Sequence, residues 1–128
     1  MIVSLHVATG AAAGALVRSR TLALLLGPPL HLAGDRVPHE DIDDLSFEIG
    51  SGLGCLALLA LRRGPLDPAV LGGAAASYPD LEHVVPWLRI GGRKLFHGGG
   101  GRHGEGMPAA LQLVLAGAMV GWLLSRPR

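Results

Sequence analysis

Apolar segments separated by short polar stretches dominate this chain of 128 residues. None of the segments alternates apolar and polar residues with a period of two, which is the pattern of a half-buried strand. We therefore expect an all-α protein, a small bundle of about four to five helices in one domain over residues 1–128. The prolines Pro28 and Pro29 predict a break in the second segment. The five segments cover residues 5–17, 21–34, 45–61, 68–78 and 108–125.

The composition favours a membrane location for these helices. Only 16% of the residues are charged, whereas soluble domains have about 25%. The 20 glycines suit helices that approach one another closely within a bilayer. The last segment is the strongest candidate span, and Trp122 near its basic end fits an interfacial anchor. A full span needs about 20 apolar residues, so three segments are marginal, and we expect a multi-pass protein of the cell membrane.

The charged residues divide between the two ends of the expected helices. Arginine pairs follow the first, third and fifth segments, and all three pairs share one side if successive segments alternate in direction. The positive-inside rule makes that side cytoplasmic. The candidate metal ligands fall at the opposite ends, which predicts a one-sided metal site on the extracytoplasmic side. The arginines are Arg18 and Arg20, Arg62 and Arg63, and Arg126 and Arg128.

The stretch HLAGDRVPHEDIDD supplies the first group of candidate ligands. His31 and Asp35 are four residues apart and therefore share one face of a helix. Both adjoin apolar sequence, where ionisable residues are costly and usually functional. We expect both to bind a metal ion, with His39 as a further ligand. The alternative for the acidic run is a solvated loop followed by the helix start DDLSFE, which contains Asp44 and Glu48.

The stretch SYPDLEHVV supplies the second group. Asp80 and His83 are three residues apart, about one helical turn, and we expect them to bind metal together with His6 at the start of the first segment. Mixed imidazole and carboxylate ligands suit Zn, Mn or Fe more than Ca or Mg, and zinc is the favoured divalent ion. Glu82 or Asp35 is a candidate catalytic general base.

A third group lies in FHGGGGRHGEG, where glycines separate His97 from His103. Glycines allow a backbone to approach phosphate closely, although such a run is also typical of a linker. We expect His97, Arg102 and His103 to bind substrate, with nearby basic residues holding an anionic group. These are Arg89, Arg93 and Lys94.

These motifs together resemble the membrane-bound metal-dependent hydrolase family, the inner-membrane proteins of the YdjM type. LHVATGAAAGAL is similar to the first helix of the family, HLAGDRVPHED to its His-x-x-x-Asp helix, and SYPDLEHVV to its Pro-Asp-x-Asp-His element. Here the Pro-Asp element follows the His-x-x-x-Asp helix instead of preceding it, and Glu82 stands where the family has Asp. The resemblance implies metal ligands among His6, His31, Asp35, Asp80 and His83.

The predicted function is that of a membrane-bound metal-dependent hydrolase, in which metal-activated water attacks a phosphoester or ester of a lipid-like substrate. The expected partners are a membrane lipid or a small anionic substrate, and the net charge of +1 gives no argument for nucleic acid. Two alternatives remain open. The first is a non-enzymatic membrane protein that binds or transports metal or forms a structural helix bundle. The second is a soluble helical protein similar to zinc phosphodiesterases.

Overall fold

The computed structural model describes residues 1–85 and 106–126, and within these ranges the chain is helical without any strand. Five helices have ten or more residues, which confirms the predicted all-α bundle. Tyr78–Asp80 forms a 3-10 turn that leads into the short helix α5, Leu81–Val84. The five long helices are α1 Val3–Val17, α2 Arg20–Asp35, α3 Leu45–Arg63, α4 Pro68–Ser77 and α6 Ala109–Ser125.

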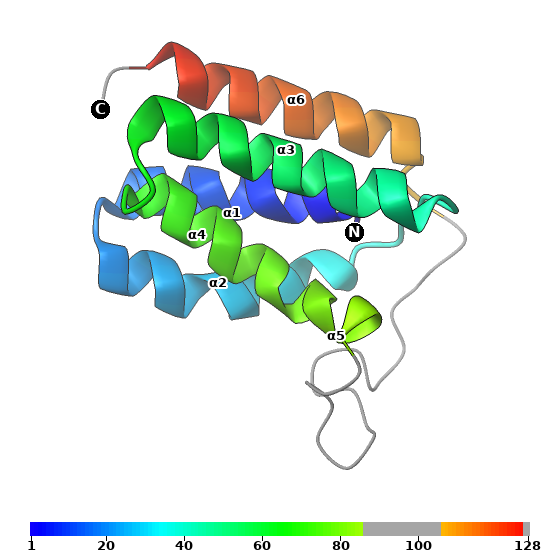
Figure 1. Cartoon of the computed structure of the whole chain (residues 1–128). Helices are drawn as coiled ribbons and strands as arrows, with labels where there is room; N and C mark the ends of the chain where they lie inside the picture. The colour runs from blue at the N-terminus through cyan, green and yellow to red at the C-terminus, as the bar shows by residue number, and fades with distance from the viewer. Residues whose placement is uncertain (86–105, 127–128) are drawn as a thin grey trace.

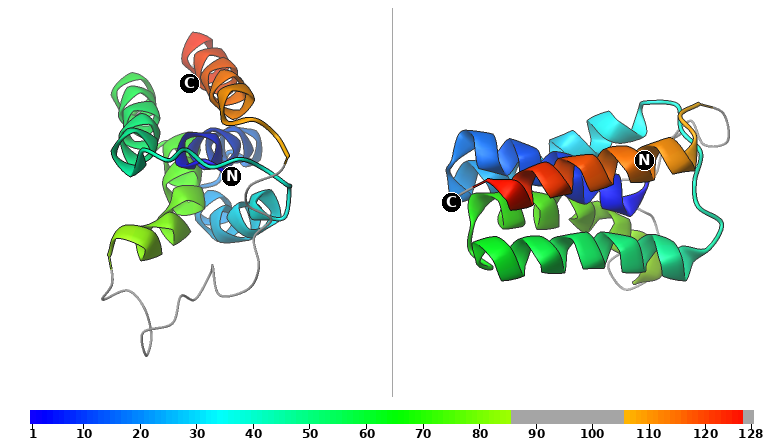
Figure 2. Two further views of the ribbon diagram at one scale, coloured as in Figure 1. Left: turned by 90° about the vertical axis from the view of Figure 1, so that its right-hand side faces the viewer. Right: turned by 90° about the horizontal axis from the view of Figure 1, so that it is seen from above.

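Helix α1 occupies the centre of the bundle, and α2, α3, α4 and α6 surround it (Figures 1 and 2). The sequence of α1, VSLHVATGAAAGALV, combines apolar and small side chains, so the helix can be covered on several faces. Apolar side chains from α1, α3, α4 and α6 form one core cluster. Its buried members are Ile2, Leu5, Val7, Ala8, Ala11, Leu59, Ala69, Val70, Ala116, Val120 and Leu123.

The contact between α1 and α4 brings the two backbones together. A Cβ atom added at Gly10 would lie 2.3 Å from the carbonyl oxygen of Gly72, and one at Gly14 would lie 2.0 Å from that of Pro68. These distances leave no room for a side chain, so the two helices depend on glycine for their approach. The same kind of small-residue packing is common between helices in membranes.

Helix α2 continues through Pro28 and Pro29, so the predicted break is wrong. The prolines lack the backbone N–H groups that would bond to the preceding turn, but contacts with other helices hold α2 together. Gly27, directly before the prolines, packs so closely on α4 that an added Cβ would lie 2.4 Å from the Cβ of Ala75. Tertiary packing therefore outweighs the local cost of the prolines.

Aspartate side chains cap two of the helices. Asp44 accepts a hydrogen bond of 3.0 Å from the N–H of Phe47 at the start of α3, which confirms the predicted helix start. Asp67 accepts one of 2.9 Å from the N–H of Ala69 at the start of α4. Such caps satisfy N–H groups that have no partner within the helix.

The close contact of α1 and α4 predicts opposite effects for two matched substitutions. Gly14→Ala should lower the free energy of unfolding by roughly 1–3 kcal/mol, because the new methyl group overpacks the contact. Gly54→Ala, where nothing lies within 4 Å of an added Cβ, should leave stability unchanged or raise it by up to about 1 kcal/mol through helix propensity. Thermal unfolding followed by circular dichroism measures both, and equal effects would contradict the proposed dependence on glycine.

Candidate metal centre

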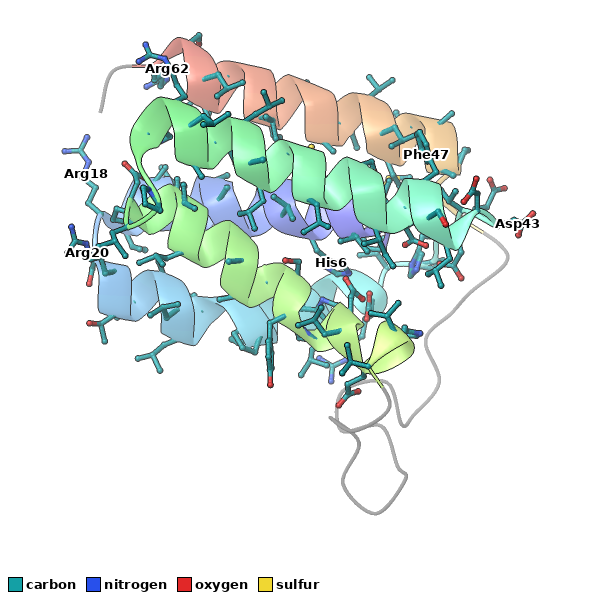
Figure 3. The ribbon with its side chains drawn as sticks, viewed as in Figure 1. His6, Arg18, Arg20, Asp43, Phe47 and Arg62 are labelled. Carbon is teal, nitrogen blue, oxygen red and sulfur yellow. The ribbon has the colours of Figure 1, made fainter. Side chains whose placement is uncertain are left out.

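Four side chains from three elements meet near one end of the bundle. His6 comes from α1, His31 and Asp35 come from the last two turns of α2, and Asp80 comes from the 3-10 turn after α4. Figure 3 shows Asp43 at the outer end of this side of the molecule and Arg18, Arg20 and Arg62 at the opposite end. The four side chains are named the His–Asp cluster below.

Asp35 joins the two histidines of the His–Asp cluster. Its Oδ1 atom lies 3.0 Å from Nε2 of His6, and its Oδ2 atom lies 3.1 Å from Nε2 of His31. The second contact spans one turn of α2, as the four-residue spacing predicts. Because one carboxylate contacts both imidazoles, the two Nε2 atoms face the same small region.

His31 is fully buried and has a defined hydrogen-bond partner on one side of its ring. Its Nδ1 atom lies 2.8 Å from the carbonyl oxygen of Ala76, so Nδ1–H donates this bond. A neutral imidazole then carries a lone pair on Nε2. That lone pair faces Oδ2 of Asp35 at 3.1 Å and Oδ1 of Asp80 at 3.7 Å. A cation between these three acceptor atoms, either a metal ion or a proton on Nε2, would offset their mutual repulsion.

His6 is stacked against His31, with ring centroids 3.9 Å apart and an interplanar angle of 25°. The His6 ring is buried, and its Nδ1 atom has no hydrogen-bond partner among the described residues. Leaving a buried polar atom unsatisfied costs about 1–3 kcal/mol. An apolar side chain at position 6 would avoid this cost, so the presence of His6 favours a role in binding over a role in packing alone.

The donor atoms suit a zinc-sized ion. One donor atom from each of His6, His31 and Asp80 can be chosen so that all three lie within 4.8 Å of one another. Zinc bonds of about 2.0–2.1 Å in tetrahedral geometry separate the donors by roughly 3.3 Å, so the three groups need only small shifts to share an ion. The hydrogen bond from His31 to a backbone carbonyl is the usual support for a metal-binding histidine.

His39 lies beside the His–Asp cluster but outside this set of three donors. It is buried in the loop after α2, where its Nδ1–H donates a bond of 2.7 Å to the carbonyl of Val37. Its Nε2 atom lies 3.3 Å from Oδ1 of Asp41 and also contacts the amino group of Met1. That amino group lies 2.9 Å from Oδ1 of Asp35, so His39 reaches the cluster through Met1.

A cavity of about 150 Å³ opens beside the His–Asp cluster and is lined by Asp35, Asp80 and His83, among others. His83 is exposed at this cavity, whereas Glu82 is buried and does not line it. The cavity gives water or a small group access to the two carboxylates. Of the two predicted general bases, Asp35 is therefore the one that faces this space.

Three predicted substrate-binding residues, His97, Arg102 and His103, lie outside the described residues, as do Arg89, Arg93 and Lys94. Two groups that contact the His–Asp cluster could not be predicted from the sequence. The carbonyl of Ala76 and the amino group of Met1 are backbone groups, and no pattern of side chains indicates their position.

Comparisons with protein-family models, with curated proteins and with solved structures find no significant match to this chain. The resemblance to membrane-bound metal-dependent hydrolases therefore stays a prediction that depends on the quoted motifs.

Proposed function

We propose that this chain is a membrane-embedded protein that binds a divalent metal ion, preferably zinc, in its His–Asp cluster and hydrolyses an ester or phosphoester of a lipid-like substrate. One observation carries the proposal. The Nε2 lone pair of His31, with its direction fixed by the bond from Nδ1 to Ala76, faces the carboxylates of Asp35 and Asp80. A metal ion held at this point by His31 and Asp80 would also offset the negative charge of the neighbouring Asp35.

The exposed apolar surface supports the membrane part of the proposal. Helix α3 has 19 residues with a mean hydropathy of 1.4, and within the described residues it is the one helix long and apolar enough to cross a bilayer. Such a helix is weak evidence alone, but only 11% of it is buried inside the protein. Leucines and valines on α2 and α6 are exposed as well, for example Leu25 at 66% and Val114 at 65%.

The opposite charge at the two ends supports an orientation. Arg18, Arg20 and Arg62 lie at one end of the bundle (Figure 3), and the positive-inside rule assigns such an end to the cytoplasm. The His–Asp cluster then faces the extracytoplasmic side. A site open at one end favours a hydrolase or a metal-binding protein over a transporter, which needs access from both sides.

The chemistry divides between the ion and the protein. A bound divalent ion supplies Lewis-acid activation of water and of the substrate oxygen. His6, His31 and Asp80 would hold the ion, and the Ala76 carbonyl keeps His31 in the required tautomer. Asp35 lines the cavity and contacts both imidazoles, so its carboxylate oxygens can accept the proton that water loses during attack.

The membrane location is tested with two leucines of α3 that differ in position along the helix. Leu53, near the middle, is 61% exposed, and Leu61, near the basic end, is 83% exposed. A lysine at mid-bilayer costs about 2.5–3.5 kcal/mol, whereas a lysine near the interface can extend its ammonium group to water. Leu53→Lys should therefore lower the amount of chain that stays in the membrane pellet after an alkaline wash, and Leu61→Lys should not. Release of the wild-type chain without detergent would contradict a membrane location.

Metal binding is tested by elemental analysis of detergent-purified protein. We expect about one zinc ion per chain in the wild type. The His31→Ala variant should retain much less zinc, because it loses both a ligand and the hydrogen bond to Ala76, which lowers zinc affinity at least about tenfold. His83→Ala is the matched control, because His83 is exposed at the cavity and lies outside the three-donor set. Circular dichroism confirms that each variant is folded. A metal-free wild type would mean that His31 carries a proton instead, and loss of metal in His83→Ala would make His83 a ligand.

Hydrolysis is tested with bis(p-nitrophenyl) phosphate and p-nitrophenyl acetate as chromogenic probes for phosphodiesters and esters. The metal-loaded protein should release p-nitrophenol from at least one probe, a chelator should abolish this activity, and added Zn²⁺ should restore it. The His31→Ala variant at equal concentration is the control for contaminating hydrolases. A protein that holds stoichiometric metal but hydrolyses neither probe would favour the non-enzymatic metal-binding alternative.

A further inference from the structure

A second and larger cavity lies at the basic end of the bundle. Its volume is about 790 Å³, which falls within the range of roughly 300–1,000 Å³ that is typical of small-molecule sites. Residues from the ends of α1, α3 and α6 and from the start of α4 line it. It shares no lining residue with the cavity beside the His–Asp cluster.

The charged side chains that line this cavity are mostly positive. Arg18, Arg63 and Arg126 contribute three guanidinium groups, against a single carboxylate from Asp67. Asp67 is already paired with Arg63, whose Nε atom lies 3.1 Å from Oδ1. The cavity therefore has two more guanidinium groups than carboxylates, which suits an anion. Guanidinium groups bind phosphate through paired hydrogen bonds.

Contacts within the fold hold two of the three arginines, Arg63 and Arg126, in the cavity wall. The Nη1 atom of Arg63 donates a bond of 3.3 Å to the carbonyl of Leu123, so this side chain links α3 to α6. The guanidinium carbon of Arg126 lies 4.3 Å from the ring centroid of Trp122, a cation–π contact. Arg18 has a left-handed backbone with φ of 53° at the end of α1. This conformation favours glycine or asparagine, so the arginine side chain is present despite a backbone cost.

Much of the remaining wall is apolar, and part of it is exposed. Leu16, Trp122 and Leu123 line the cavity, and the side chain of Leu16 is 75% exposed. A ligand for this space needs an anionic group for the arginines and hydrocarbon for the leucines. A free inorganic anion would leave the apolar part of the wall in contact with water.

We propose that this cavity binds the phosphate group of an anionic phospholipid, with the first part of an acyl chain against the apolar wall. Basic pockets between helices on the cytoplasmic side of a membrane bind anionic headgroups in this way. The proposal goes beyond metal binding and hydrolysis, because it uses none of the residues of the His–Asp cluster. It shares only the membrane orientation with the proposed function.

The test titrates detergent-purified wild-type chain with dihexanoyl phosphatidic acid, a short-chain lipid that dissolves as monomers, by isothermal calorimetry. Dihexanoyl phosphatidylcholine and inorganic phosphate are titrated separately. The double variant Arg18→Gln with Arg126→Gln removes two charges from the cavity, and Arg20→Gln with Arg62→Gln is the matched control. The control removes the same charge from the same end of the bundle at residues that do not line the cavity.

We expect saturable binding of phosphatidic acid that weakens at least about tenfold in the cavity variant, because the variant loses charge-assisted hydrogen bonds to the phosphate group. The control variant should bind within about threefold of the wild type, since exposed charges outside the site contribute little. Phosphatidylcholine and inorganic phosphate should bind much more weakly. Asp80→Ala should leave lipid binding intact even where it removes metal, so failure of the metal site and failure of this cavity are separable.

Three results would overturn the proposal. Absence of saturable binding by folded wild-type chain would exclude a lipid site, and equal losses in the two double variants would reduce it to general charge attraction. Inorganic phosphate that binds as tightly as phosphatidic acid would assign the cavity to a small phosphate instead of a lipid.

Discussion

The backbone contact between α1 and α4 is the constraint on which the site depends. The two helices are antiparallel, with Gly14 against Pro68 and Gly10 against Gly72. One further turn along both helices leads to His6 on α1 and to Ala76 on α4. Ala76 provides the carbonyl that fixes His31, and His31 stacks on His6. The His–Asp cluster is therefore the continuation of a helix contact that only glycine permits.

The helices and part of the site can be predicted from the sequence because these features depend on residues close together in the chain. Apolar segments without period-two alternation predict the helices, and the spacing of His31 and Asp35 predicts a shared face that the structure bears out at 3.1 Å. Convergence of His6 and Asp80 on this pair depends on long-range packing, which spacing does not encode. The continuation of α2 through Pro28 and Pro29 has the same origin, since the contact of Gly27 with Ala75 holds the helix.

A membrane location would explain both the exposed apolar side chains and the buried polar side chains, because the surroundings would change from lipid to water along the bundle. In water, the exposed leucines and valines of α2, α3 and α6 would contribute no hydrophobic stabilisation, which is about 25 cal/mol for each Å² of apolar surface that is buried. In the proposed membrane location, the same side chains would contact lipid. The imidazoles and carboxylates then gather at one end, where the partly exposed Asp35 and Asp80 line the smaller cavity.

The length of α1 separates the two proposed sites in function as well as in space. His6 and Arg18 are twelve residues apart in the chain, and a helix rises 1.5 Å per residue, so they lie roughly 18 Å apart along the axis. A phosphate held by Arg18 and Arg126 therefore cannot reach the His–Asp cluster while it is bound. In the proposed arrangement, a phospholipid in the basic cavity would anchor and orient the bundle in one leaflet, and an ester substrate of the metal centre would have to approach from the opposite side.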